Sequence, residues 1–109
     1  METKTPREFF EKTLPSKFDA DKAAGLEAIV QVNITGANGG NWIIAIKDKK
    51  MDIKEGRDSS ASITIKTTDN DFVDLVNGKL NGVEALMRGR LEFRGKMSIG
   101  LRLLDVGLI

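Results

Sequence analysis

Apolar and polar residues alternate through the middle third of the chain. In residues 27–35, Ala28, Val30, Val32 and Ile34 fall on one side, and polar residues fall on the other with Ile29 as the exception. A period of two is the signature of a half-buried strand. The pattern therefore predicts a strand over 27–35, closed by a glycine-rich turn over 36–40.

Further strands are predicted after that turn. Residues 41–47 are rich in isoleucine and carry the single tryptophan, and residues 50–55 follow across an Asp48-Lys49 hairpin turn. Beyond Gly56, a polar loop leads into another alternating segment. Its inward side is Ala61, Ile63 and Ile65, and its outward side is Ser62, Thr64 and Lys66. Because each segment has one polar side, we expect an antiparallel sheet with one face in water.

Helix signals precede this block of strands. Thr5 is a suitable N-cap, Pro6 fits the first helical position, and Glu8 completes a capping box. Phe9, Phe10 and Leu14 supply the buried side of this helix, and Pro15 is expected to end it. A short helical turn within 16–24, closed by Gly25, is expected before the first strand.

After Lys66 the period changes from two to about 3.6 residues. Thr68 and Asp71 form a capping box for a helix that Gly78 ends. Asn81 and Glu84 begin a second, shorter helix that runs through Met87 and ends at Gly89. The buried side of the first of these helices is Phe72, Val73, Leu75 and Val76.

Residues 90–94 alternate again and predict a fifth strand with Leu91 and Phe93 inward, ended by Gly95. A last helix is expected from Lys96 towards Val106. At about 100° per residue it carries two apolar stripes on nearly opposite sides. They are Met97, Leu101, Leu104 and Leu108 on one, and Ile99, Leu103 and Val106 on the other. A helix on a sheet needs one stripe, so the second needs a partner: a ligand, another subunit, a membrane or other helices of the domain.

Composition excludes several kinds of function. The 109 residues predict one domain, 1–109, and the 17 basic and 16 acidic side chains nearly balance. The absence of cysteine, histidine and tyrosine excludes disulfides, thiolate metal sites and the usual general base. We therefore expect no catalytic residues, no cofactor and no metal. No apolar run has transmembrane length and the N-terminus lacks a signal-peptide core, so the cytoplasm is the expected compartment.

Two motifs invite a ligand interpretation but favour a structural one. Asp69, Asp71 and Asp74 lack the glycine and distal glutamate of a calcium loop, and acidic residues are favoured in a first helical turn. The glycines of 36–40 lack a following lysine with serine or threonine, and they precede a strand instead of a helix. They predict a hairpin turn.

The C-terminal third is mildly basic. Arg88, Arg90, Arg94 and Lys96 surround the predicted fifth strand, and no aromatic residue lies between them on the outward face to stack on a base. We expect a solvated face or contact with an anionic head group, and no nucleic acid.

In the order and spacing of its short motifs, the chain resembles the sterol carrier protein family, the type-two sterol carrier domain, from about Phe10 to Leu104. Each motif that carries the resemblance is weakly specific alone, and their order and spacing are specific together. They are Gly40-Asn41-Trp42, Asn77-Gly78-Lys79-Leu80, the passage from Ala85 to Leu91, and Phe93-Arg94-Gly95-Lys96-Met97 leading into Leu101-x-Leu103-Leu104.

The resemblance implies an α+β fold: a five-stranded, largely antiparallel sheet with helices packed on one face, enclosing an apolar tunnel. It also implies non-catalytic binding and transfer of fatty acids, fatty acyl-CoA, sterols or phospholipids, with transient contact to a membrane surface. The alternative is an interaction module that homodimerises through the C-terminal helix and has no functional ligand.

The residues expected to line the tunnel come from the two middle helices, the last strand and the last helix. They are Phe72, Val76, Leu86, Met87, Phe93, Met97, Leu101 and Leu104. Arg94, Lys96 and Arg102 are expected to meet the head group of the ligand or of the membrane. The last helix, weakened by Gly100 and Gly107, is the expected lid.

Overall fold

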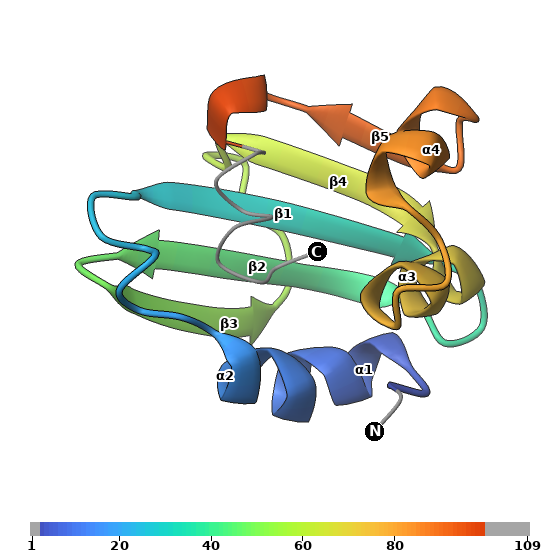
Figure 1. Cartoon of the computed structure of the whole chain (residues 1–109), viewed down its shortest axis with the longest axis horizontal. Helices are drawn as coiled ribbons and strands as arrows, with labels where there is room; N and C mark the ends of the chain where they lie inside the picture. Colours follow the sequence, from blue (N-terminus) through green and yellow to red (C-terminus); the bar gives the residue numbers. More distant parts are fainter. Residues whose placement is uncertain (1–2, 100–109) are drawn as a thin grey trace.

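The computed structural model describes residues 3–99, and a single five-stranded sheet forms its centre (Figure 1). The strands are Ala28–Thr35 (β1), Gly40–Lys47 (β2), Lys50–Glu55 (β3), Ile63–Thr68 (β4) and Leu91–Arg94 (β5). They lie in the order β3-β2-β1-β4-β5. β1 pairs with β2 antiparallel and with β4 parallel, and the β2–β3 and β4–β5 pairs are antiparallel. The predicted five-stranded, largely antiparallel sheet is confirmed.

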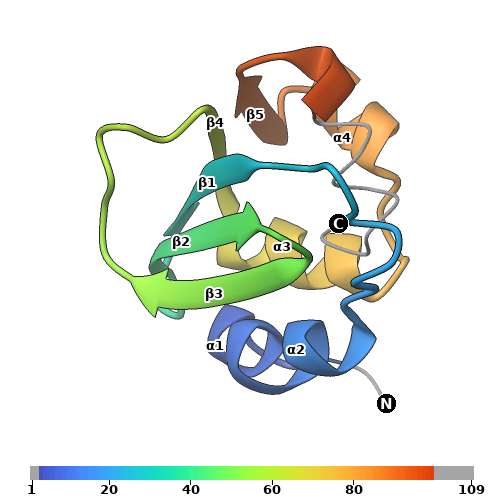
Figure 2. The same cartoon turned by 90° about the vertical axis from the view of Figure 1, so that its left-hand side faces the viewer.

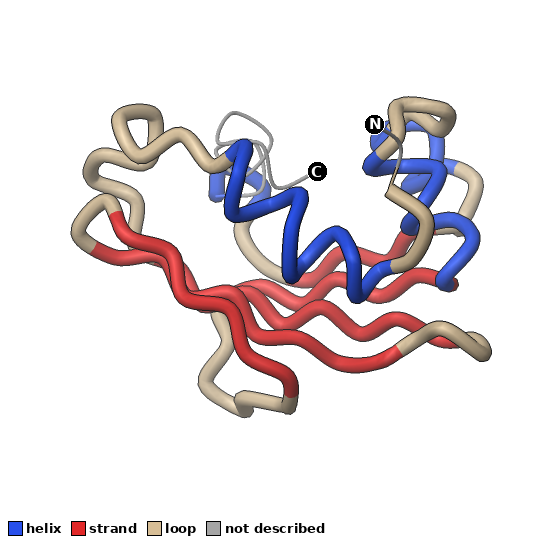
Figure 3. Tube along the Cα trace, turned by 90° about the horizontal axis from the view of Figure 1, so that it is seen from below, coloured by secondary structure: helices blue, strands red, loops and turns tan. Residues whose placement is uncertain are grey.

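Strand register places the predicted inward residues on one face. Val32 of β1 lies opposite Trp42 of β2 on one side and Ile65 of β4 on the other. The buried apolar residues of this inner face are Ala28, Val30, Val32, Ile34, Trp42, Ile44, Ile46, Ile63, Ile65 and Leu91. Helices lie over the inner face only (Figure 3), so the core forms between the sheet and the helices.

The N-terminal helix runs along the β3 edge of the sheet (Figures 1 and 2). It consists of Pro6–Glu8 (α1), a π-helical turn Phe9–Thr13 (η1) and Leu14–Lys17 (α2). Thr5 caps it by accepting a hydrogen bond from the Glu8 N–H. The expectation that Pro15 ends this helix is wrong. The π turn, in which the Leu14 N–H donates to the Phe9 carbonyl, widens the helix just before the proline, and such a turn relieves the clash of a proline ring with the preceding turn.

The two middle helices begin and end as predicted. α3 (Asp69–Val76) is capped by the Thr68 hydroxyl, which accepts from the Asp71 N–H, and α4 (Gly82–Met87) is capped by the Asn81 side chain. Gly78 and Gly89 follow with φ of 76° and 74°, the left-handed conformation that closes a helix at low cost for glycine. The Asp71 carboxylate does not complete the predicted capping box, because it binds Arg90 instead.

The β2–β3 hairpin turns through Asp48 and Lys49, with φ of 52° and 63°. Two successive positive φ values define the two-residue turn whose twist matches that of the flanking strands. Side chains other than glycine or asparagine are disfavoured in this conformation, which costs about 1–2 kcal/mol per residue.

We expect Lys49→Gly to raise the free energy of unfolding by about 0.5–1 kcal/mol, since it removes this strain and the flexibility of unfolded glycine offsets only part of the gain. Denaturant unfolding measures the change. Lys50→Gly is the matched control: it lies in β3, where glycine is expected to cost roughly 0.5–1 kcal/mol. If both variants lose the same free energy of unfolding, the turn is not strained.

The outer face of the sheet is tied to the β3–β4 loop through Gln31, which is only 5% exposed. Its Nε2 donates to the carbonyls of Trp42 (3.2 Å) and Gly56 (3.0 Å), and its Oε1 accepts from the Asp58 N–H (2.8 Å). The Ser60 hydroxyl and backbone N–H in turn bind the Asp58 carboxylate and lower its pKa. These bonds hold the loop across the outer face on its way to β4.

Residues 97–99 are helical, where the predicted last helix begins. The rest of the predicted helix lies outside the described residues, and with it the predicted lid, the homodimer surface and the second apolar stripe except for Ile99, which is half-buried against the core. The predicted site residues affected are Leu101, Arg102 and Leu104. Within residues 3–99, each helix is too short or too polar to cross a bilayer.

Candidate functional site

Four aromatic side chains meet where the N-terminal helix crosses the sheet. The ring of Phe10 stacks on Trp42 of β2 at 4.7 Å between centroids and on Phe72 of α3 at 5.4 Å. Phe9 completes the group, with its ring edge-on to Phe10 and Phe72. All four are buried. Together they form an aromatic wall that joins the N-terminal helix, the sheet and α3.

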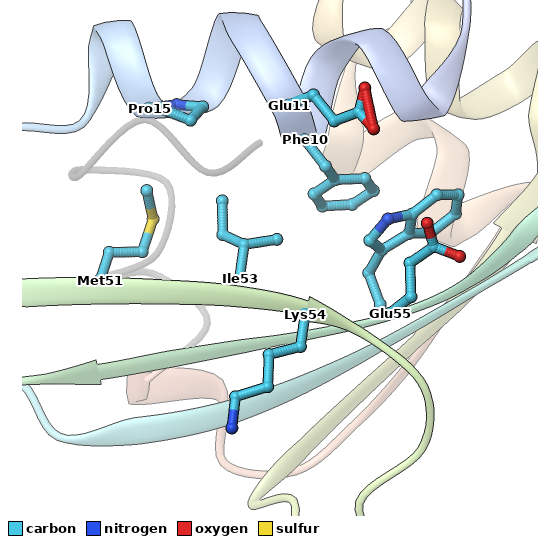
Figure 4. Close-up of a pocket in the computed structure, with 8 residues that line it drawn as sticks. Phe10, Glu11, Pro15, Met51, Ile53, Lys54 and Glu55 are labelled. Carbon is cyan, nitrogen blue, oxygen red and sulfur yellow. The ribbon is translucent and has the colours of Figure 1, made fainter.

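A pocket of about 470 Å³ opens beside this wall, between the N-terminal helix and β3 (Figure 4). Its lining residues are Phe10, Glu11, Pro15, Trp42, Met51, Ile53, Lys54 and Glu55. Figure 4 shows Phe10 pointing down from the helix, and Met51 and Ile53 pointing up from β3 to meet it. Lys54 points away from the pocket, as the alternation of a strand requires, and its ammonium lies 3.8 Å from Asp52.

The pocket has one apolar end and one charged end. Pro15 and Met51 lie at the first, and Glu11 and Glu55 at the second (Figure 4). Arg7 joins the two carboxylates: it donates to Glu55, and its Nη1 lies 3.4 Å from Glu11.

The Arg7 guanidinium also lies over Trp42, 5.9 Å from the ring centroid. The hydrogen bond between Arg7 and Glu55 raises the pKa of the guanidinium and lowers the pKa of the carboxyl. Both groups are therefore charged at neutral pH.

Gly40 sets the position of the tryptophan. It lies two residues before Trp42 on the same face of β2, and a Cβ added to it would come within 2.8 Å of the indole ring. The indole therefore lies directly over a residue with no side chain. This contact is a physical reason for the sequence Gly40-Asn41-Trp42, one of the motifs that carry the family resemblance.

The residues predicted from sequence to line a tunnel are distributed differently. Phe72 is buried in the aromatic wall, and Val76 and Phe93 are half-buried against the core. Leu86, Met87 and Met97 are 38%, 83% and 55% exposed. Among the residues 3–99, Phe72 thus adjoins the pocket through its stack on Phe10, while Leu86 and Met87 of α4 lie at the surface.

Of the predicted head-group residues, Arg94 lies on the far side of the sheet from the pocket, and Arg102 lies outside the described residues. Arg94 faces outward from β5, opposite Thr64 of β4, and Lys96 is exposed. Arg90, expected on the same outward face, precedes β5 and binds Asp71 with Nε at 3.1 Å and Nη2 at 2.5 Å. That bond raises the pKa of Arg90.

The acidic residues at the start of α3 have structural roles. Asp69 accepts a hydrogen bond from the Asn38 N–H in the β1–β2 turn, and Asp71 binds Arg90. In the described part of the chain, no three acidic side chains gather where they could hold a metal ion.

Sequence reasoning missed the combination of Phe10, Trp42, Met51 and Ile53. Each was assigned to a buried helix side or to a strand, but no pattern indicated that they share a pocket. The available signal was Trp42: a large aromatic residue preceded by two glycines requires a partner above it, and Phe10 is the aromatic residue that fills this role.

One protein family matches this chain along nearly its whole length. The model of the SCP-2 sterol transfer family matches residues 8–106. Hydroxysteroid dehydrogenase-like protein 2 of Bos taurus is 31% identical over 84 residues, which cover 76% of this chain and 20% of the relative. The chain thus spans about a fifth of the length of that relative.

Solved structures share the fold. The sterol carrier protein domain 2 of Helicoverpa armigera aligns with a TM-score of 0.74 at 24% identity, over 99% of this chain and 93% of that one. Sterol carrier protein-2 of Aedes aegypti, in complex with palmitate, aligns with a TM-score of 0.62 at 20% identity, over 90% of this chain and 94% of that one. These likenesses support the α+β fold with helices on one face of the sheet.

Proposed function

The chain belongs to the SCP-2 sterol transfer family, and we propose that it binds the hydrocarbon chain of a lipid in the pocket between its N-terminal helix and β3. The proposed role is carriage of the lipid without covalent chemistry. Transfer to and from a membrane surface completes the proposal.

The observation that carries this proposal is the pocket itself. Its volume of about 470 Å³ lies within the range of about 300–1,000 Å³ that small-molecule sites occupy. Phe10, Trp42 and Ile53 provide aromatic and aliphatic walls, and the charged side chains cluster at one end. An amphiphile has the same distribution of polarity, with a long apolar chain and one polar head.

Burial of the chain supplies the binding energy. Each methylene removed from water contributes about 0.8 kcal/mol, so about sixteen carbons contribute roughly 12 kcal/mol when fully buried. Association and ordering cost several kcal/mol or more. Since the pocket is open at one side, partial burial of the chain and binding in the micromolar range are expected.

Two comparisons bear on the ligand and on the chemistry. The mosquito protein of the same fold holds palmitate, which supports a fatty acyl chain as the apolar part of the ligand. The bovine relative is a longer protein named for a dehydrogenase, and this chain covers only a fifth of it. We therefore propose carriage, not dehydrogenation, for this domain.

The single tryptophan lines the pocket, so its fluorescence tests the proposal. A fatty acid brominated at mid-chain quenches indole emission only on contact. We expect saturable quenching of Trp42 by the brominated fatty acid and none by the same fatty acid without bromine. Absence of quenching across brominated fatty acids, alcohols and phospholipids would contradict the proposed pocket.

A second reporter separates this pocket from the lining predicted from sequence. Phe93→Trp in a Trp42→Phe background moves the only indole to β5, beside the predicted tunnel residues. We propose that Phe72 and Phe93 extend the apolar site beyond the pocket, so a long chain is expected to quench at both positions and a short one at Trp42 alone. Quenching confined to position 93 would place the ligand on the β5 side.

A further inference from the structure

The charged end of the pocket carries more negative than positive charge. Arg7 lies between two carboxylates, Glu11 from the N-terminal helix and Glu55 from the end of β3. One positive and two negative groups leave this trio with a net charge of −1. The positive charge of Lys54 does not correct the balance inside the pocket, because that side chain points to the outer face (Figure 4).

Arg7 already has two negatively charged partners, both bound through Nη1. Its guanidinium donates to Glu55 and Glu11 and lies over the Trp42 ring. A ligand carboxylate or phosphate that binds the remaining N–H groups of Arg7 lies close to these two protein carboxylates and is repelled by them. A hydroxyl group has no such difficulty, since it donates to a carboxylate oxygen and accepts from a free guanidinium N–H.

We infer that Glu11 and Glu55 are specificity-determining residues: through Arg7 they make this end of the pocket select lipids with an uncharged, hydroxyl-bearing head group over lipids with an anionic one. The inference rests on the proposed function, because it concerns the ligand of the same pocket. It also assigns ligand binding and membrane contact to different faces: the pocket selects the ligand, and the basic residues on the far face of the sheet contact a membrane.

A matched pair of ligands tests the selection. The probes are a long-chain alcohol and the carboxylate of the same chain, both brominated at mid-chain and titrated against Trp42 fluorescence at a mildly alkaline pH. We expect the alcohol to bind about three- to tenfold more tightly, as the repulsion of one nearby like charge at a partly exposed site predicts. Equal or tighter binding of the carboxylate would overturn the inference.

Charge variants at the same end give opposite expectations. Glu55→Gln makes the trio neutral and is expected to narrow the preference for the alcohol to about twofold or less, whereas Arg7→Gln makes it more negative and widens the preference. A purely steric effect of these exposed side chains would not be expected to change the preference in opposite directions in Glu55→Gln and Arg7→Gln. Loss of preference in both variants would therefore also overturn the inference.

Glu92→Gln is the control, because it changes the net charge of the protein by the same amount from the exposed outer face of β5. It is expected to leave the preference unchanged, and a narrowing equal to that of Glu55→Gln would count against a local effect. If neither probe quenches Trp42 in any variant, the proposed pocket fails. If both quench without preference, only the selection fails.

Discussion

Phe10→Ala is expected to lower the free energy of unfolding by about 3–5 kcal/mol, the range found when a buried phenylalanine is truncated. The side chain is 3% exposed and contacts three other aromatic rings, so the surrounding structure cannot close the space that it leaves. Such a loss is a large part of the roughly 5–15 kcal/mol that stabilises a typical domain. Urea unfolding followed by circular dichroism measures it.

Two further variants show whether the loss comes from the aromatic wall. Phe10→Leu keeps an apolar side chain but removes the stacking on Trp42, and we expect it to cost about 1–2 kcal/mol and to weaken quenching by brominated lipid. Val83→Ala, at a position 64% exposed on α4, is expected to change stability by no more than about 0.5 kcal/mol. A similar loss in Phe10→Ala and Val83→Ala would contradict the described packing.

The local elements of this fold were predictable because short-range chemistry determines them. Alternation between Ala28 and Ile34 predicted a strand with the correct inner face, and Asp48-Lys49 predicted the hairpin. Thr5, Thr68 and Asn81 cap the helices that their positions indicated. Each of these features depends on residues within a few positions of one another.

Features that depend on distant parts of the chain were not predictable in the same way. Alternation is the same for a parallel and an antiparallel neighbour, so it did not reveal that β1 and β4 run parallel. Pro15 is a helix breaker by its own chemistry, and only the π turn before it allows the helix to continue. Gln31 was placed correctly on the outer face, but its burial requires the β3–β4 loop to cross there.

The candidate site shows the same limit. Phe10, Trp42 and Met51 come from three elements, and their meeting depends on the angle at which the N-terminal helix crosses the sheet. The resemblance to a family predicted the fold and a lipid ligand. The lining that it predicted on the C-terminal elements stays a prediction, since Leu101 and Leu104 lie outside the described residues, and it gave no indication of the pocket against the N-terminal helix and β3.

Gly39→Ala is expected to destabilise the protein by more than about 3 kcal/mol, beyond the roughly 1–3 kcal/mol usual for overpacking. An added Cβ would lie 2.2 Å from the Ile34 carbonyl oxygen, which is backbone and belongs to β1. Relief of this contact requires the end of β1 to move away from β2, where Ile34 pairs with Gly40. Thermal and urea unfolding of the purified variant measure the loss, and a variant that accumulates only as aggregate meets the same expectation.

Alanine variants at two other glycines, Gly82 and Gly40, separate the effect of the clash from the effect of the added methyl group. Gly82→Ala adds a Cβ that meets nothing within 4 Å at the start of α4, and we expect it to be neutral or to stabilise by up to about 1 kcal/mol. Gly40→Ala brings the Cβ against the Trp42 ring, which is held between Gly40 and Phe10, so we expect a shift in tryptophan emission together with a smaller loss of stability. An unchanged emission maximum in Gly40→Ala would contradict the packing of Trp42 over Gly40, and full stability in Gly39→Ala would contradict the close approach of Gly39 to the β1 backbone. Because Trp42 also lines the pocket, Gly40→Ala connects the packing at the start of β2 to the capacity of the protein to hold a ligand.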